Sequence, residues 1–363
     1  MWQDANIVIK SEHSNNFCVE KASLLFAAGV AAGAVTGLSG SVAYAVVGIA
    51  AILCAFLPMT GREKAIPPTF LLAGFFTFTL QSLGWATMDG PMPLAQRAGE
   101  AFRAYIDTLP FENEGTAPLL NAFLTGDRSG LAKETVSAFR KAGASHLLAL
   151  SGLHMGILYM VFDRLSRPMG RYPAVRRVRY VTLISASAFF TLMTGASPSM
   201  VRAFLFILTG ETAGLLGREK KLGRTLCTAL MLQLAITPQA ITSVGFQLSY
   251  LALAGIVLLY PLMEKWYPSD GRTSLMRKIW KLSALSISCQ VFTAPLTLYL
   301  FGSFPPHFLL TNLLAIPLTT CLMTVALAVL GLSALGICPG FMYVAADALG
   351  AALRFCLEVI SSL

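Results

Sequence analysis

Apolar residues gather into long windows along most of this chain, and each window is close to the length of a membrane-spanning helix. A helical span needs about 20 predominantly apolar residues. The windows lie near residues 22–38, 41–58, 67–88, 146–162, 180–194, 200–216, 226–241, 244–262, 282–300, 308–332 and 341–360. The alternating strands of about ten residues that mark a transmembrane barrel are not seen in this pattern. The sequence therefore predicts an all-α fold, a polytopic transmembrane helical bundle of about 10 or 11 spans.

The composition agrees with a membrane protein. Of the 363 residues, 55% are hydrophobic and only 12% are charged, and the mean hydropathy is +0.67. A soluble globular domain carries about twice that share of charged residues. The seven cysteines are scattered, mostly in apolar windows, without the spacing of metal ligands, so we interpret them as small lipid-facing or core-facing side chains. We expect no cofactor and no metal.

Lys and Arg indicate the orientation of the chain, because short cytoplasmic loops hold an excess of both. The stretch 163–180 carries six arginines against one acid, and further basic loops follow at 217–225 and 264–281, two and four predicted spans later. These loops are therefore predicted to be cytoplasmic. The predicted regions are a cytoplasmic N-terminal tail (1–21), N-terminal transmembrane helices (22–88), external amphipathic helices (89–145) and a transmembrane core (146–363), in the cytoplasmic (inner) membrane with the N-terminus inside.

The predicted external segment contains two amphipathic helices joined by a turn. In residues 94–107, charged side chains follow one another at helical spacing beside an apolar stripe. The second helix, 130–143, ends at Gly143, where a glycine beyond the last helical residue is expected, and Ser145 can cap the next helix. The connecting "FLTGDRSG" is rich in Gly, Asp and Ser, which predicts a turn.

The window "SHLLALSGLHMGILYMVF" (145–162) is apolar, yet it carries three groups able to do chemistry. As one continuous helix turning about 100° per residue, it would place His146, Ser151 and His154 on one edge. Gly152 and Gly156 would form a close-packing G-x-x-x-G surface on the other edge, and Gly152 could also break the helix. Three interpretations stay open: hydrogen bonds between helices, the lining of a pathway, or Ser/His catalysis. The catalytic one lacks the expected turn around the serine and an orienting acid.

A second polar cluster lies in "LMTGASPSMVRAFL" (192–205). Its turn contains Gly195, Ser197 and Pro198, and Arg202 follows about one turn inside the next predicted span. A buried arginine at mid-bilayer costs at least about 2.5–3.5 kcal/mol, so it needs a partner. Snorkelling to the headgroups, an ion pair with Asp127 or Glu211, and contact with a phosphate at a pore mouth are the alternatives.

Two further clusters lie toward the C-terminus. Their polar or helix-bending residues are Gly245, Gln247, Pro295, Asn312 and Pro317. The two prolines are expected to kink or break spans on either side of an external turn at 302–307. Each cluster alone is typical of contacts between helices. Their recurrence near one side of the membrane favours a shared polar vestibule.

These polar segments occur in the order and at the spacing of one known family. "LTGDRSGLAKETVSAFRKAGASHLLALSGLHMGIL" resembles the hallmark segment of the ComEC family, the polytopic channel proteins of bacterial natural transformation. "LTGASPSMVRAF", "VGFQLSYLAL" and "LFGSFPPHFLLTNLLAIPL" then follow in the family's order. The resemblance covers about residues 90–335, whereas the helices before residue 88 resemble the family only in hydropathy.

The resemblance implies passage of single-stranded DNA across the cytoplasmic membrane. The net charge of +9 permits this, although much of it is the ordinary positive excess of cytoplasmic loops. The predicted DNA path or entrance consists of Asp127, Arg128, His146, Ser151, His154, Ser197, Arg202, Gln247 and Asn312. The predicted packing or hinge residues are Gly152, Gly156, Gly195, Pro198, Gly245, Pro295 and Pro317. Arg128 and Arg202 are expected to meet phosphates.

The chain also departs from the family's pattern. Members commonly carry an external OB-type domain and a C-terminal metallo-β-lactamase-like domain that is proposed to be a nuclease. Residues 89–145 are too short and too helical in pattern for an OB barrel, and the four histidines form no H-x-H-x-D-H signature. We therefore expect the membrane part alone, a channel rather than an enzyme, without a nuclease or a metal. A complete protein and a truncated copy both stay open.

The expected partners are single-stranded DNA and membrane lipid, with an external DNA receptor, a separate nuclease and a cytoplasmic motor ATPase as further candidates. No phosphate-binding loop of the G-x-x-x-x-G-K-[ST] kind occurs in the sequence, so a partner or an ion gradient would drive movement. The oligomeric state is open. The alternative functions are a transporter of a smaller anionic metabolite or lipid, and an intramembrane serine hydrolase.

Overall fold

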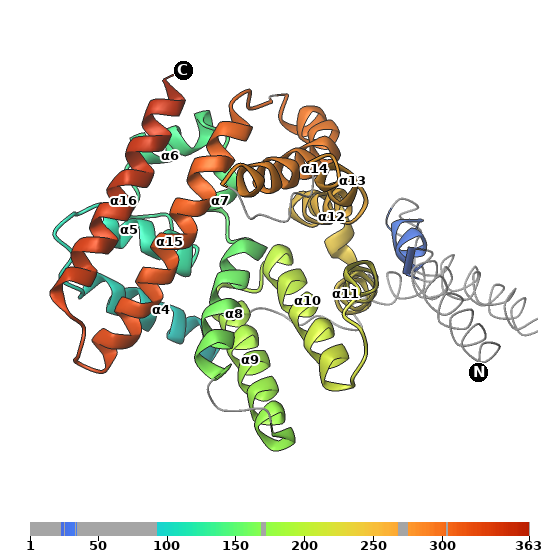
Figure 1. Cartoon of the computed structure of the whole chain (residues 1–363), viewed down its shortest axis with the longest axis horizontal. Coiled ribbons are helices and arrows are strands. Elements are labelled where there is room, and N and C mark those ends of the chain that lie inside the picture. Colours follow the sequence, from blue (N-terminus) through green and yellow to red (C-terminus); the bar gives the residue numbers. More distant parts are fainter. Residues whose placement is uncertain are drawn as a thin grey trace, which may run out of the picture. The chain divides into compact units, whose positions relative to one another are not determined.

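The structure is a computed structural model that describes residues 23–34 except 25 and 33, and residues 93–167, 172–267, 275–302 and 304–362. Throughout these ranges the regular structure is helical and no strand occurs, which confirms the all-α prediction (Figure 1). The predicted N-terminal tail (1–21) and most of the predicted N-terminal transmembrane helices (22–88) lie outside the described residues.

The helices follow one another with short connections. In chain order they are α4 (Pro93–Asp107), α5 (Thr116–Leu124), α6 (Lys133–Lys141), α7 (Ser145–Leu148), α8 (Gly152–Ser166), α9 (Pro173–Met193), α10 (Pro198–Leu215), α11 (Leu222–Ile236), the 3₁₀ helix η2 (Pro238–Thr242), α12 (Val244–Leu258), α13 (Tyr260–Glu264), α14 (Leu275–Phe301), α15 (Phe308–Ala334) and α16 (Gly340–Ser361).

Among the described residues, three helical stretches are long and apolar enough to cross a membrane, so the chain is a membrane protein. They are Val244–Glu264, Leu275–Phe301 and Phe308–Ala334. Pro295 lies inside the second and Pro317 inside the third, and both are exposed. Neither proline breaks its helix, contrary to one form of the prediction, because each removes a single backbone hydrogen bond from a helix of 27 residues.

The chain divides into two compact units. The first includes residues 205–247, where η2 packs on α11 and Lys220 donates to Glu211 at 2.5 Å. The second includes Pro91–Phe204 and Leu248–Leu363, and it contains nearly all of the predicted polar residues.

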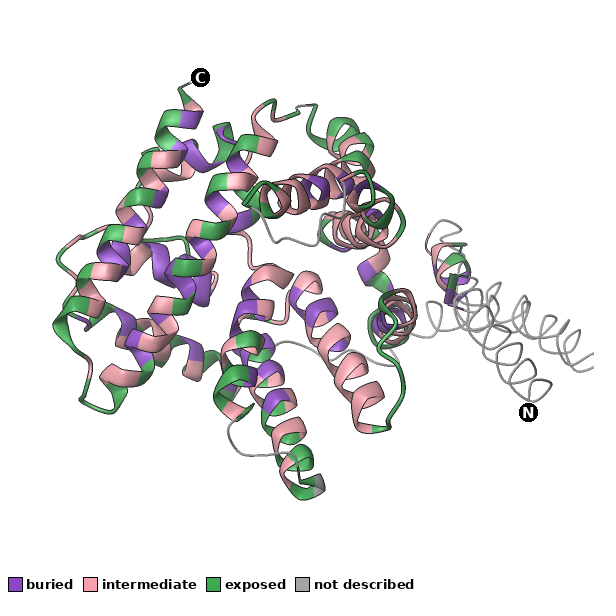
Figure 2. Ribbon diagram, viewed as in Figure 1, coloured by how far each residue is buried: buried purple, intermediate pink, exposed green. Residues whose placement is uncertain are grey.

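The second unit has one continuous hydrophobic core built by α4 to α7 together with α8, α15 and α16. Phe123 and Phe139 are fully buried there and meet edge to face, with their ring centroids 6.3 Å apart. Burial of such a side chain stabilises the fold by about 1.5–3 kcal/mol. The buried stripes of α15 and α16 face this core in Figure 2. The core holds the segment before α8 in place.

The helices α4 to α6 extend along α15 instead of covering one of its ends (Figure 1). The hydroxyl of Tyr105 donates to the carbonyl oxygen of Leu330 at 3.0 Å, and the hydroxyl of Thr311 donates to the carbonyl oxygen of Ala142 at 2.6 Å. Residues 311 and 330 are about 28 Å apart along a helix that rises 1.5 Å per residue. The segment 93–144 is therefore a lateral support for α15.

The first helix of this segment also packs against the end of α9. A Cβ atom added at Gly99 would lie 3.0 Å from the carbonyl oxygen of Met193, so the two backbones approach closely. Tyr105, six residues further along α4, bonds to the C-terminal end of α15. The C-terminal ends of α9 and α15 consequently lie against the same helix. The sequence predicts that the turn 302–307 is external, and a span that crossed inward from there would end on the opposite side of the membrane from the C-terminal end of α9.

The sequence predictions for the ends of these helices were partly correct. Gly143 follows α6 with φ +77°, which confirms the predicted terminal glycine. Ser145 does not cap the next helix, because the capping position of α7 is occupied by Ala144. The helix α5 was not predicted as an element of its own. Its apolar sequence is explained by burial, since most of its residues face the core.

Candidate functional site

The window 145–162 forms two helices with a break between them. The short α7 ends at Leu148, Ala149 is extended, and Ser151 is the N-cap of α8. The expected single helix is therefore wrong, and so is its single polar edge, because helical rotation does not continue through the break. The break precedes Gly152, which had been considered as a breaking point. Its cause is the capping preference of Ser151, which a count of apolar residues does not detect.

Ser151 and His154 form a capping box at the start of α8. The Ser151 hydroxyl accepts from the backbone N–H of Leu153 at 3.3 Å, and the Nδ1 atom of His154 accepts from the backbone N–H of Ser151 at 3.2 Å. Because Nδ1 is an acceptor here, the proton of the neutral imidazole belongs on Nε2. That atom is buried and has no hydrogen-bond partner. The Nε2–H group of His154 is thus a buried donor without an acceptor in the described chain.

The turn between α5 and α6 docks against this break. A Cβ atom added at Gly126 would lie 2.6 Å from the side chain of Leu150, and Nε of the exposed Arg128 donates to the carbonyl oxygen of Leu148 at 3.1 Å. Asp127 accepts from the backbone N–H of Ser129 at 3.0 Å and pairs with Arg103 at 3.2 Å. The hydrogen bonds from Ser129, and after them Arg103, lower the pKa of the Asp127 carboxyl.

Arg202 of α10 lies against the start of α8. It is only 8% exposed, and a Cβ atom added at Gly152 would lie 3.3 Å from its Nη2 atom. Its guanidinium carbon is 6.0 Å from the centre of the Tyr250 ring, a cation–π distance. The Nη1 atom is buried and has no hydrogen-bond partner.

The structure does not contain the acidic partner that the sequence suggested for Arg202. Asp127 pairs with Arg103, and Glu211 pairs with Lys220. Within the described residues no ion pair involves Arg202. The ring of Tyr250 compensates part of the charge.

The turn before α10 adds another polar atom. Gly195 has φ +80° and Ala196 φ +48°, so the chain reverses sharply there before Pro198 opens α10. The carbonyl oxygen of Ser197 accepts from the backbone N–H groups of Met200 and Val201, whereas its hydroxyl oxygen is buried without a partner. In α15, which packs against α8, the Oδ1 atom of Asn312 is also buried without a partner.

Four predicted site residues therefore share one property: each keeps a buried polar atom that nothing in the described chain satisfies. They are His154, Ser197, Arg202 and Asn312. Buried polar groups are hydrogen-bonded in most proteins, and an unsatisfied one costs about 1–3 kcal/mol. The atoms come from three separate motifs of the sequence. Such a group is expected where water or a polar ligand enters the protein.

A polar pocket of about 380 Å³ opens beside these elements. Its walls come from α4, from the residue before the turn Gly126–Arg128 (the G-D-R turn) and from the turn between α9 and α10. The lining residues include Gln96, Glu100, Arg103, Thr125, Thr194 and Gly195. Most of these residues escaped the sequence prediction. The helical spacing of Glu100 and Arg103 was visible, but the pattern could not show that α4 packs against α9.

Other predicted residues lie outside this group of unsatisfied atoms. His146 on α7 is exposed but close enough to His154 to interact with it electrostatically. Gly156 has open space within 4 Å of an added Cβ atom, so the predicted close packing is seen at Gly152 and not at Gly156. Gln247 belongs to the first unit, where its amide donates to the carbonyl oxygen of Ile241 at 2.9 Å, and Gly245 is exposed there. In the part of the chain that the structure describes, no group of three or more His, Cys, Asp or Glu side chains could hold a metal ion.

Comparison with known proteins places these residues in a family. The family described as Competence protein matches residues 123–363. The chain is 29% identical over 221 residues to ComE operon protein 3 of Bacillus subtilis (strain 168), covering 61% of this chain and 26% of that protein. It is 30% identical over 218 residues to competence protein ComA of Neisseria gonorrhoeae, covering 59% of this chain and 30% of that protein.

Recombination protein 2 of Haemophilus influenzae is 26% identical over 212 residues, covering 56% of this chain and 27% of that protein. The chain thus spans between a quarter and a third of the length of these curated relatives. No solved structure matches it.

Proposed function

Since the chain belongs to the Competence protein family, we propose that it is a cytoplasmic-membrane channel that takes up single-stranded DNA in natural transformation. The observation that carries this proposal is a pair of buried donors without acceptors, Nε2 of His154 in α8 and Nη1 of Arg202, whose guanidinium lies against Gly152 at the start of α8. A phosphate oxygen is an acceptor that suits both a guanidinium and an imidazole N–H.

The geometry supports a division of roles among the basic groups. Arg128 is exposed beside the break and meets the incoming strand at the entrance. Arg202 of α10 is buried against Gly152, the first residue of α8, and meets phosphates further along, where Nε2 of His154 in α8 offers a second donor. Because nucleic-acid affinity depends on contacts between phosphates and Arg or Lys, two such contacts in series provide guidance without sequence preference.

Neutral polar groups line the path with bound water. The Ser197 hydroxyl and the Asn312 amide oxygen are satisfied by water when no strand is present, and they exchange that water for the strand during passage. Ser151 holds the histidine in place through the capping box. Directional movement comes from partners, with an external DNA receptor, a separate nuclease and a cytoplasmic motor ATPase as the candidates.

A smaller anionic substrate is the second candidate, because the polar pocket of about 380 Å³ has the size of a small-ligand site. The serine-hydrolase alternative is weaker. A general base needs a free nitrogen facing the serine, and Nδ1 of His154 already accepts the backbone N–H of Ser151. Within the described residues no carboxylate orients this histidine.

Transformation by external DNA tests the proposal. A strain lacking the gene is complemented with wild-type chain, with Arg128→Ala plus Arg202→Ala, or with Arg218→Ala as a control in an exposed basic loop. At equal membrane abundance, the double variant should transform at least about tenfold less often, since a charged hydrogen bond is worth about 1.5–3 kcal/mol. Transformation of the double variant at the wild-type frequency would show that neither arginine contacts the DNA strand.

A further inference from the structure

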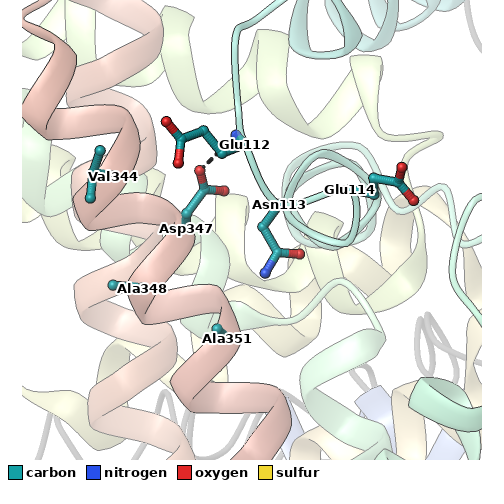
Figure 3. A pocket seen from close by; sticks show the side chains of 7 residues that line it. All are labelled: Glu112, Asn113, Glu114, Val344, Asp347, Ala348 and Ala351. Carbon is teal, nitrogen blue, oxygen red and sulfur yellow. Dashed lines mark hydrogen bonds between the residues drawn. The ribbon is translucent and has the colours of Figure 1, made fainter.

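A second, larger pocket lies on α16 and on the loop between α4 and α5. Its volume is about 700 Å³. Three acidic residues, Glu112, Glu114 and Asp347, line it together with Val344, Ala348 and Ala351 of α16; the carboxylates of Glu112 and Asp347 lie near α16, whereas that of Glu114 points away from it (Figure 3). The pocket therefore combines negative charge with an apolar surface, and no basic side chain is among its lining residues.

Asp347 is the unusual member of this pocket. It is 8% exposed, and its Oδ2 atom accepts from the backbone N–H of Glu112 at 2.9 Å. The Oδ1 atom is buried and has no partner. Figure 3 shows this carboxylate reaching from α16 toward the loop that carries Glu112 and Asn113. A buried carboxylate with an unsatisfied oxygen is costly, which points to a donor that enters the pocket from outside.

The neighbouring cation does not satisfy Asp347. Arg354, two turns further along α16, donates from Nη2 to the Oδ1 atom of Asn113 at 2.7 Å. None of the three pocket carboxylates takes part in an ion pair within the described ranges. The charge of the pocket is thus left for a ligand.

The spacing of the carboxylates distinguishes between kinds of cation. Among the described residues no acidic group is compact enough to hold a metal ion. An ammonium on a carbon chain fits better, because it has three donors for separate oxygens and its methylene stem can lie along Val344, Ala348 and Ala351. We propose that this pocket binds an alkylammonium group, supplied by a free polyamine or by a lysine side chain of a partner protein.

This inference does not depend on DNA passage, so binding is measured directly. Purified chain in detergent is dialysed at low ionic strength against labelled spermidine and, separately, against a labelled trilysine peptide. Saturable binding of one or both is expected. Spermidine alone would indicate a free polyamine, trilysine alone a protein lysine, and both the shared chemistry. If neither binds saturably, the proposal is overturned.

Matched variants connect binding to the pocket. Asp347→Asn keeps an acceptor for the N–H of Glu112 but removes the charge, and should weaken binding about tenfold or more. Glu358→Gln, an exposed acid on the same helix, should change nothing. Val344→Lys places an ammonium at the pocket and should abolish binding, whereas Val359→Lys, at another exposed position of α16, should not.

Thermal unfolding in detergent verifies that each of these variants is folded. Wild-type affinity in both Asp347→Asn and Val344→Lys would overturn the assignment to this pocket, even if the chain binds ammonium elsewhere.

Discussion

The hydroxyl oxygen of Ser151 lies 3.1 Å from Nδ1 of His154, and the same nitrogen accepts the backbone N–H of Ser151. A serine and a histidine at this distance suggest catalysis, but here they cap a helix. The capping box fixes the imidazole so that its other nitrogen, Nε2, is presented to the interior without a partner. The pair thereby joins the start of α8 to the predicted DNA path.

The capping role makes a prediction at Ser151. Ser151→Ala should lower the free energy of unfolding by about 0.5–2 kcal/mol, because it removes the acceptor for the Leu153 N–H. Ser151→Asn should keep stability and transformation near wild type, since asparagine is a good N-cap but not a nucleophile. Thermal unfolding and transformation frequency are the measurements. Loss of all activity in the asparagine variant would instead favour a nucleophilic serine.

The two glycines of the G-L-H-M-G stretch should differ sharply. Gly152→Ala adds a methyl group 3.3 Å from Nη2 of Arg202, and displacing that guanidinium should reduce transformation about tenfold. Gly156→Ala meets nothing within 4 Å and should raise helix stability by up to about 1 kcal/mol without affecting uptake. Both variants are compared at equal abundance. Equal effects on transformation would show that Arg202 is not held by close packing at Gly152.

The Asp127 carboxylate should make the G-D-R turn sensitive to acid. Its pKa is lowered in the folded protein by the bonds from Ser129 and the charge of Arg103. The stability it contributes is therefore present above the unfolded pKa of about 3.9 and is lost as pH falls through the lower folded pKa.

Asp127→Asn should consequently unfold at a lower temperature than wild type at pH 6, and the difference should shrink below about pH 4. Melting curves in detergent across pH 3–7 measure this. A difference that stays constant with pH would mean that the charge of Asp127 is not involved.

The contacts of α4 predict the side on which α15 ends. Gly99 packs on the C-terminal end of α9, which is predicted to be external, and Tyr105 of the same helix bonds to Leu330 near the C-terminal end of α15. A cysteine at the exposed Leu335 should therefore react with a membrane-impermeant maleimide added outside, as should a cysteine at Thr108. A cysteine at Arg177, in the basic loop, should react only after permeabilisation. Labelling of Leu335→Cys only from inside would contradict this prediction and show that α15 crosses from the external to the cytoplasmic side.

The sequence was informative about chemistry and less so about geometry. Apolar windows predicted the helical class, and residue type marked Arg202 and His154 as polar groups that a bilayer would not tolerate alone. The break before α8 was expected only as an alternative, at Gly152, because a cap depends on one serine and one histidine, not on periodicity. The pocket at Gln96 depends on how α4 packs on α9, a contact between distant segments that no local pattern encodes.

Passage of a strand through purified protein in liposomes tests the central claim most directly. Labelled single-stranded DNA and a labelled small organic phosphate are offered outside vesicles that contain wild type or the Arg128→Ala plus Arg202→Ala variant, with an imposed ion gradient and with empty vesicles as the control. The account predicts protected internal DNA with wild type, at least about tenfold less with the variant, and none in empty vesicles. Entry of the small phosphate without any DNA would contradict a DNA channel and identify a transporter of small anions.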